Sequence, residues 1–460
     1  MGRHAGLLGA VAILIWLVRS PLHAAGPDIR YDPRLAKQAF IEALRAARQI
    51  PDASQRDWAV YGWVLAQAGI DPEGALAVAR GLVAGGEYGE YKGIISFILD
   101  SASARDPKLG LRLLAACEKE FGSREDLGRV GELVRFRARF ADDPDSLLTG
   151  SDDELSRSVE MLVEEDMGRA YQAAQHIQDP QKRDAALNLV VIMAPRGGWT
   201  AGDAEKRLAI AESIQDKALR DRAVAQALTA LASQSPERAL DMLAEVESLA
   251  SHDEALGMIA IEFANHGQPL RGLDLARAIV DQKAREDALA YGVLAGLCRV
   301  DADRALAMAD AVTGAMARLE ARENVLAALC RADPDRALGL ARGAPETERN
   351  LLLRCMLGPL VEVGRGEEAF RMATAVEGPE SRVGALQAVL EVMTREQPAK
   401  AAALVEQVTP RDRREEAMAV LAGELIRISP QDAVDTARRI SDPERRAFAL
   451  TRIGSFLTPR

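Results

Sequence analysis

Apolar and small residues recur along this chain at the spacing of short α-helices that come in pairs. Residues 410–443 illustrate the pattern: Pro410 begins a helical stripe of small and apolar residues that runs to Leu425. Ser429-Pro430 then interrupts the chain, and the Ser429 hydroxyl is placed to cap the next helix. That helix has one apolar face, and Asp442-Pro443 opens the following unit. The pattern therefore predicts antiparallel helix pairs joined by tight turns.

The helix pairs repeat with a regular period. A small residue followed by an apolar or small one opens the second helix of each unit, and this phrase recurs at nearly constant intervals. Its occurrences are Ala239-Leu240, Gly272-Leu273, Ala305-Leu306, Ala337-Leu338, Ala369-Phe370, Ala401-Ala402 and Ala433-Val434. A period in this range marks a stacked repeat protein. The sequence therefore predicts an all-α fold, an α-solenoid of about 11 to 13 antiparallel helix pairs with a period of about 32–33 residues.

The repeat resembles the tetratricopeptide-like (TPR-like) α-solenoids over most of residues 30–460. Their second-helix pattern is visible as Ala433, Ala437 and Ile440, although such repeats usually carry an aromatic residue where Ala437 stands. Their first-helix Trp and Tyr positions are mostly missing here. The unit is also similar to HEAT-like helix pairs, which usually run longer. The resemblance implies a superhelical scaffold that binds proteins or peptides along a groove.

Residues 1–25 have the pattern of a targeting segment. Arg3 and His4 precede an apolar run, Leu7–Val18, which is too short to cross a bilayer as a helix because about 20 residues are needed. A signal peptide cleaved near Ala24 or Ala25 is our interpretation, and a retained N-terminal anchor is the alternative. We therefore expect a periplasmic or secreted protein, with no membrane span in the mature chain unless that segment is retained.

The rest of the chain, residues 26–460, is expected to be one continuous helical repeat domain. Residues 120–205 are less regular, so we expect any bend or specialised site there. The final helix, Glu444–Leu457, is expected to cap the open end of the stack.

Charge and cysteine content narrow the possible partners. The net charge is −11, and removing residues 1–24 makes it −13, because Arg3 and Arg19 are lost without any acid. Such a chain without basic runs is a poor binder of nucleic acid.

Cys298 and Cys330 stand at matching points of adjacent repeats, where we interpret them as buried small residues; a disulfide and a metal site are the alternatives.

Five units carry an Asp followed four residues later by an Arg. The pairs are Asp52/Arg56, Asp179/Arg183, Asp216/Arg220, Asp281/Arg285 and Asp442/Arg446. Asp is suited to cap a helix, and the spacing gives the Arg an ion-pair partner within the first turn. We expect a structural ladder that fixes the turns and bridges neighbouring units. The alternative is a row of guanidinium groups for an acidic partner.

Aromatic side chains are concentrated in the first fifth of the chain. They either seal the N-terminal end of the stack or form a binding patch, since Tyr and Trp are favoured anchors at interfaces. The candidates for partner binding are Trp58, Tyr61, Trp63, Tyr88 and Tyr91.

We find no convincing catalytic, cofactor-binding or metal-binding set in the sequence. His252 stands where the repeat phrase has Arg, and no His has metal-ligand spacing. The function we expect is therefore an exported, non-catalytic scaffold for protein–protein or protein–peptide interaction in the cell envelope. The alternative is a cell-envelope enzyme acting on peptidoglycan or another polysaccharide, whose helical part would resemble the curved domain of lytic transglycosylases. Its carboxylates would come from the acidic runs within Asp152–Asp166.

Overall fold

A computed structural model describes residues 32–85, 93–121, 125–143, 148–163, 166–193 and 203–457. These residues form helices and connecting turns, with no β-strand among them. The helices pack in adjacent pairs, which confirms the predicted all-α, solenoid-like fold class. None of the described helices is both long and apolar enough to cross a lipid bilayer. The predicted signal peptide, residues 1–25, lies outside the described residues.

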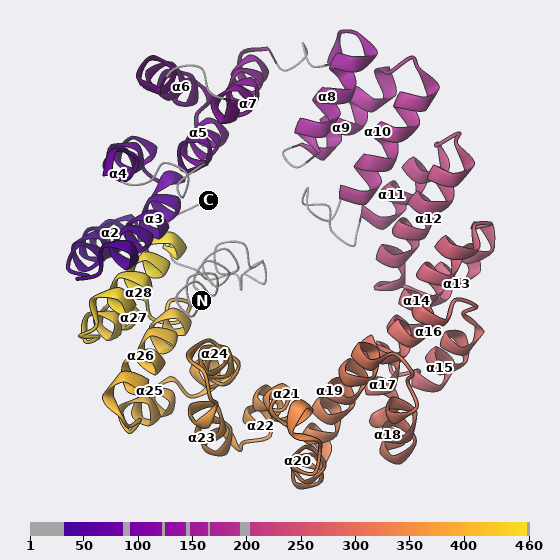
Figure 1. Cartoon of the computed structure of the whole chain (residues 1–460). Coiled ribbons are helices and arrows are strands. Elements are labelled where there is room, and N and C mark those ends of the chain that lie inside the picture. The colour runs from indigo at the N-terminus through magenta and orange to yellow at the C-terminus, as the bar shows by residue number, and fades with distance from the viewer. Residues whose placement is uncertain are drawn as a thin grey trace. The chain divides into compact units, whose positions relative to one another are not determined.

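The chain forms two compact units, whose helices are labelled in Figure 1. Unit 1 combines the two ends of the chain, residues 1–141 and 361–460, and unit 2 comprises residues 142–360. The helices of unit 1 are α2 (Pro33–Arg48), α3 (Ala53–Ala68), α4 (Pro72–Gly85), α5 (Ile94–Arg105), α6 (Pro107–Phe121), α7 (Glu125–Asp142), α23 (Gly366–Ala375), α24 (Pro379–Glu396), α25 (Pro398–Glu406), α26 (Arg411–Leu425), α27 (Pro430–Arg438) and α28 (Pro443–Phe456). α22 (Leu357–Glu362) spans the boundary between the two units in the sequence.

Unit 2 contains short helices of the same kind and two shorter irregular turns. Its helices are α8 (Asp152–Leu162), α9 (Met167–His176), α10 (Pro180–Met193), α11 (Ala204–Glu212), α12 (Lys217–Ala232), α13 (Pro236–Met242), α14 (Leu249–Asn265), α15 (Pro269–Ala278), α16 (Gln282–Ala288), α17 (Leu294–Cys298), α18 (Ala302–Asp310), α19 (Ala315–Ala332), α20 (Pro334–Arg342) and α21 (Glu346–Cys355). A 3₁₀ turn, η3 (Leu243–Glu245), follows α13, and a π-helical turn, η4 (Leu289–Val293), joins α16 to α17.

Small residues bring the two helices of each repeat close together. Pro410 precedes α26 and the Ser429 side chain caps α27, as the sequence pattern predicts. In α27 the small-apolar phrase of the second helix, Ala433 and Val434, is fully buried. In α15 a Cβ atom on Gly272 would lie 2.4 Å from the Ala260 carbonyl oxygen of α14. The period seen in the sequence is thus the period of helix–helix contact.

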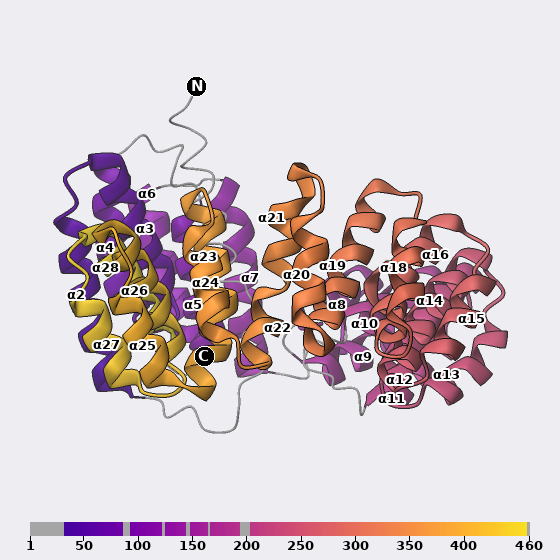
Figure 2. The same ribbon diagram turned by 90° about the horizontal axis from the view of Figure 1, so that it is seen from below.

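The last repeat is completed by the other end of the chain. α28 follows the Asp442 cap and is therefore a first helix, and no second helix follows it among the described residues. α2 takes that place, and the pair α2–α28 forms the most extensive helix–helix contact in the described part of the chain (Figures 1 and 2). α28 also packs on α3, as first helices of consecutive repeats do elsewhere. The expectation that the final helix caps an open end is therefore wrong, because α2 covers it.

Polar bonds fix this junction between the two ends of the chain. The Arg438 guanidinium donates two hydrogen bonds to the Glu42 carboxylate, at 2.9 and 2.7 Å, across 396 residues of sequence. The bond from Arg438 lowers the pKa of Glu42, and the same bond raises the pKa of Arg438. Arg446 donates a further bond of 2.7 Å to the Gln49 side chain. Arg438 is the last residue of α27, and a bidentate Arg–carboxylate pair has a defined geometry, so the pair fixes α2 against α27, while Arg446 bonds α28 to the end of α2.

One repeat in the irregular part of the sequence departs from the small-residue rule. Arg207 of α11 stands one repeat before Ala239, at the position that is small in the later repeats, and it is only 4% exposed. Its guanidinium donates to the carbonyl oxygens of Val191 in α10 and Gln226 in α12, at 3.2 and 3.4 Å. Burial lowers the pKa of this Arg. Val191 lies in the last turn of α10, so Arg207 binds one of the carbonyl groups that a helix end leaves without a partner.

Candidate functional site

Exposed apolar side chains gather on three consecutive repeats of unit 2. Of the twelve large apolar side chains that are exposed in the described residues, seven lie between residues 249 and 316. The seven are Leu249, Met258, Leu270, Val280, Tyr291, Val300 and Met316. Single exposed apolar residues are ordinary, but a concentration of them marks surfaces that bind other molecules. This stretch of α14 to α19 is therefore the candidate functional site.

Two of these side chains occupy the same position in neighbouring repeats. Met258 lies ten residues after the Ser248 cap of α14, and Tyr291 lies ten residues after the Asp281 cap of α16. Met258 is 41% exposed and Tyr291 is 57% exposed. Ala260, which contacts α15, is two residues from Met258 and so points to the opposite side of the helix. The first helices therefore present an apolar row on the side away from the second helices.

Tyr291 is carried by the π-helical turn η4. A π-turn widens the helix by one residue and leaves a carbonyl group without its usual partner, and such turns are frequent at functional sites. Here the Asn324 amide of α19 donates a hydrogen bond of 2.9 Å to the Ala290 carbonyl oxygen. On the other side, a Cβ atom on Gly292 would lie 2.5 Å from the Ile261 side chain of α14. The turn is thus held by both neighbouring repeats, and Tyr291 projects from a fixed backbone.

Carboxylates surround the apolar row. The Tyr291 hydroxyl bonds to the Glu320 carboxylate of the next repeat, and this bond and the charge of Glu320 raise the pKa of Tyr291. Glu254, one turn before Met258, accepts a 2.8 Å bond from the Gln226 amide of the preceding repeat. Asp287, one turn before Tyr291, binds the Lys283 ammonium at 2.8 Å. The surface is therefore apolar at its centre and acidic around it.

The five Asp residues predicted as helix caps all act as caps. In each case the carboxylate accepts a backbone N–H two or three residues ahead, as the sequence spacing predicts. The acceptors are Asp52, Asp179, Asp216, Asp281 and Asp442.

The Arg residues four positions later bind somewhere else. Arg56, Arg285 and Arg446 donate to the carbonyl oxygens of Ile50, Ile279 and Ile440, six residues before each of them. These carbonyl groups lie just past the end of the preceding second helix, so each Arg joins one repeat to the next. Arg183 and Arg220 hold the same fourth position in α10 and α12, and His252 holds it in α14. These bonds to carbonyl groups favour the structural interpretation over a row of guanidinium groups for an acidic partner.

A second ladder, made of carboxylates, was not predicted from the sequence. In five first helices the fifth residue is acidic. Its side chain accepts backbone N–H bonds from the turn that leads into the following repeat. Asp253 accepts from Val280 and Asp281 at 3.0 and 2.7 Å, and Glu286 accepts from Gly314 at 3.0 Å. The other members are Asp184, Asp221 and Glu415. The signal available in the sequence was an acid directly after the Arg, or His252, of the phrase in these five repeats.

Of the five aromatic candidates near the N-terminus, three lie in the described part of the chain, and these three differ in burial. Trp63 is 6% exposed, and its indole N–H donates a 2.9 Å bond to the Phe40 carbonyl oxygen. Trp58 and Tyr61 are half-buried and meet edge to face, with ring centroids 5.5 Å apart. Trp63 thus belongs to the core beside the α2–α28 junction. Tyr88 and Tyr91 lie outside the described residues.

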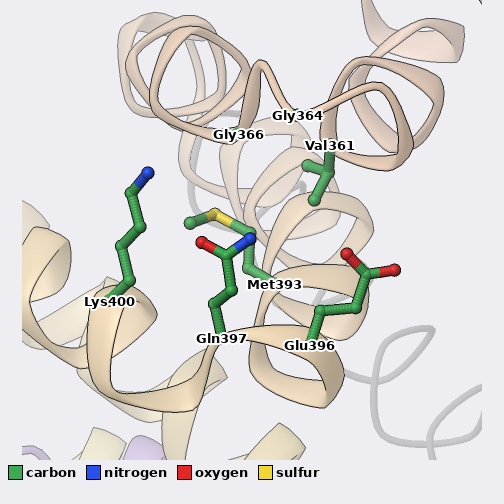
Figure 3. Close-up of a pocket in the computed structure, with 7 residues that line it drawn as sticks. All are labelled: Val361, Gly364, Gly366, Met393, Glu396, Gln397 and Lys400. Carbon is green, nitrogen blue, oxygen red and sulfur yellow. The ribbon is translucent and has the colours of Figure 1, made fainter.

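The pocket shown in Figure 3 is too small for a substrate. It lies in unit 1 between α22, α23 and α24, and its cavity of about 10 Å³ is roughly the space of one water molecule. Its lining residues are Val361, Gly364, Gly366, Met393, Glu396, Gln397 and Lys400. Lys400 binds Glu367 at 3.0 Å, so its ammonium already has a counter-charge. This pocket therefore offers no cleft for a sugar ring or a peptide.

The described residues contain no cluster of three or more His, Cys, Asp or Glu side chains placed to hold a metal ion. The four cysteines are free thiols, and those of residues 117, 298 and 330 are buried. The Cys298 and Cys330 thiols each face a main-chain carbonyl of the next repeat, that of Val325 and that of Met356. This arrangement agrees with their interpretation as buried small residues.

Comparison with known proteins adds little to this description. No protein-family model matches the chain, and no curated protein matches it. Among solved structures, the chain is similar to Ton1535 from Thermococcus onnurineus NA1, with 18% identity over 65% of this chain and 99% of that one. The TM-score is 0.24, which is too low for one structure to inform the other.

Proposed function

We propose that this protein is an exported, non-catalytic helical-repeat scaffold, related to the tetratricopeptide-like α-solenoids, that binds a protein or peptide partner in the cell envelope. The observation that carries the proposal is the gathering of seven exposed apolar side chains on α14 to α19. Tyr and Met are enriched at the centres of protein interfaces, and Tyr291 and Met258 are exposed at equivalent positions of neighbouring first helices. The stacked repeats supply a rigid support, because each first helix is bonded to the next.

Site-specific photo-cross-linking tests the interaction. The photoreactive residue p-benzoylphenylalanine is placed at Met258, and in a matched control at Ile428 of the α26–α27 turn, which is similarly exposed. Irradiation of living cells is expected to give a discrete protein adduct at position 258 and none at position 428. Equal labelling at the two positions, or no adduct at 258 in a folded protein, contradicts the proposal.

Export is tested separately, at the N-terminus of the mature protein. We expect the protein purified from the cell envelope or medium to begin near Gly26, because the apolar run ends before Ala24-Ala25. A protein that keeps Met1 and fractionates with the cytoplasm argues against a cleaved signal peptide and against the periplasmic or secreted location.

A further inference from the structure

The acidic face is the exposed side of the first helices in three consecutive repeats of unit 2. It consists of two apolar side chains, Met258 and Tyr291, and four carboxylates one helical turn away from them or on the adjacent repeat. The carboxylates are those of Glu254, Glu262, Asp287 and Glu320. Residues four apart lie on the same side of a helix, so Glu254 and Glu262 flank Met258 on α14.

The charge on this face is not neutralised by its own residues. Lys283 is the cation beside Asp287, and its side chain is 85% exposed with its ammonium bonded to that carboxylate. The nearby Arg285 and Arg318 are turned towards the carbonyl oxygens of Ile279 and Val312, at 2.7 and 3.3 Å. Lys283 offsets the charge of Asp287, which leaves Glu254, Glu262 and Glu320 without a Lys or Arg ion pair among the described residues.

Two of the four carboxylates are held in place by neutral donors. Glu254 accepts its bond from the Gln226 amide, and Glu320 accepts from the Tyr291 hydroxyl. A neutral donor orients a carboxylate without cancelling its charge, so both groups remain able to bind a cation. The face is thus preorganised for positive charge at sites next to an apolar centre.

We propose that the acidic face binds an extended or helical segment of a partner protein that is rich in Lys or Arg and carries apolar side chains between them. The apolar side chains of the segment would cover Met258 and Tyr291, while its cations would pair with Glu254, Glu262 and Glu320. Lys and Arg also suit the Tyr291 ring, since a cation over an aromatic face is attracted to it. The inference rests on the proposed function, because it assigns the chemistry of the partner to the same surface.

Peptide binding tests the charge preference directly. Two fluorescein-labelled dodecapeptides are compared, with Leu at the same four positions and either Lys or Glu at the other eight. The full-length protein is expected to bind the Lys peptide, with affinity falling as salt rises, and not the Glu peptide. The double variant Glu254→Gln, Met258→Ser is expected to weaken the Lys peptide by about tenfold.

A matched variant separates the acidic face from the general acidity of the chain. Glu406→Gln, Ile428→Ser makes the same kind of change at exposed positions of unit 1, outside the candidate site, and we expect it to leave binding within about twofold. Equal binding of both peptides, no binding of the Lys peptide, or equal loss in the two double variants overturns the inference.

The adducts formed at position 258 separate this inference from the proposed function. If a partner is captured and its cross-linked segment is basic with apolar residues, both stand. An acidic or uncharged segment leaves the scaffold proposal standing and overturns the charge preference. The absence of any captured protein overturns both.

Discussion

Arg285 and Glu286 are neighbours in the chain, yet they bind in opposite directions along the stack of repeats. The Arg285 guanidinium reaches back to the Ile279 carbonyl oxygen at 2.7 Å, at the end of the preceding repeat. The Glu286 carboxylate reaches forward to the Gly314 N–H at 3.0 Å, at the start of the following repeat. Two adjacent side chains thus satisfy one helix C-terminus and one helix N-terminus, where backbone groups lack partners within their own helix.

The forward-reaching carboxylates should make stability depend on pH. Burial alone raises the pKa of Glu415, but bonds from Ser441, the Asp442 N–H and Arg411 outweigh it and lower the pKa to about 2. Because the folded pKa lies below the ordinary value of 4.5, this stabilisation is complete above pH 4.5 and is lost as the pH falls towards 2. Glu415→Gln is expected to destabilise the protein at pH 7 by about 1.5–3 kcal/mol.

Urea unfolding at several pH values checks this expectation. The difference between Glu415→Gln and the wild type should shrink steadily between pH 4.5 and pH 2. Glu406→Gln serves as the control, because Glu406 forms an exposed ion pair with Arg439 and should change stability by less than about 1 kcal/mol. A gap that is constant down to pH 2 would show that the carboxylate charge does not stabilise the turn.

Two glycine substitutions in unit 1 are expected to have opposite effects, one at the α2–α28 junction and one inside α24. A Cβ atom on Gly454 would lie 2.7 Å from ring carbons of Phe40, so Gly454→Ala should destabilise the protein by about 1–3 kcal/mol. A Cβ atom on Gly384, inside α24, meets nothing within 4 Å, so Gly384→Ala should stabilise by up to about 1 kcal/mol.

Hydrogen–deuterium exchange localises the effect of the substitution at Gly454. Gly454→Ala is expected to accelerate exchange in both α2 and α28, although they stand at opposite ends of the chain. Faster exchange in α28 alone would mean that α2 does not depend on this contact.

The π-helical turn makes a separate prediction about Asn324. Asn324→Ala leaves the Ala290 carbonyl oxygen without the bond that the next repeat provides, and should destabilise by about 1–3 kcal/mol. Exchange should accelerate in residues 289–298. Gln226→Ala, which breaks an exposed side-chain bond to Glu254, is the matched control and should have an effect below about 1 kcal/mol. Equal effects of the two variants would rule out a special role for Asn324 in holding the π-turn.

The cysteine environments predict thiols that react slowly in the folded protein. Burial raises the pKa of Cys117 to about 11 and that of Cys355 to about 12. The thiolate is the reactive form, so very little of either thiol is reactive at pH 8. Ellman's reagent should label the native protein slowly and all four thiols quickly in urea. Fast labelling of native Cys117 or Cys355, mapped by mass spectrometry, would contradict these raised pKa values.

The fold class was predictable because helix pairing is a local property of the sequence. A small residue recurs at the position of Ala433 in unit after unit, and Ser429 and Asp442 cap the helices that the pattern predicts. The junction was not predictable, because Glu42 and Arg438 are 396 residues apart and nothing in their local sequence marks them as partners. The division of the described chain into two compact units was also beyond local patterns.

The candidate site was likewise not predictable from local sequence patterns. The concentration of aromatic residues suggested a binding patch in the N-terminal fifth of the chain, but Trp63 there is buried in the core. Tyr291 stands alone in its part of the sequence, and neither the π-turn that carries it nor the bond from Asn324 of the next repeat is marked by a local pattern. The i,i+4 spacing of Asp281 and Arg285 suggested an ion pair, but Arg285 bonds to a carbonyl group in the preceding turn.

The pairing of α2 with α28 ties the completion of unit 1 to the order of protein synthesis. α2 leaves the ribosome long before α28, so α2 waits until the helices between them have been made before its partner helix exists. A chain that stops before Pro443 leaves the apolar side of α2 uncovered. The α2–α28 contact therefore forms only after α28 has been synthesised, and a chain interrupted before it exposes the apolar side of α2 to chaperones and proteases.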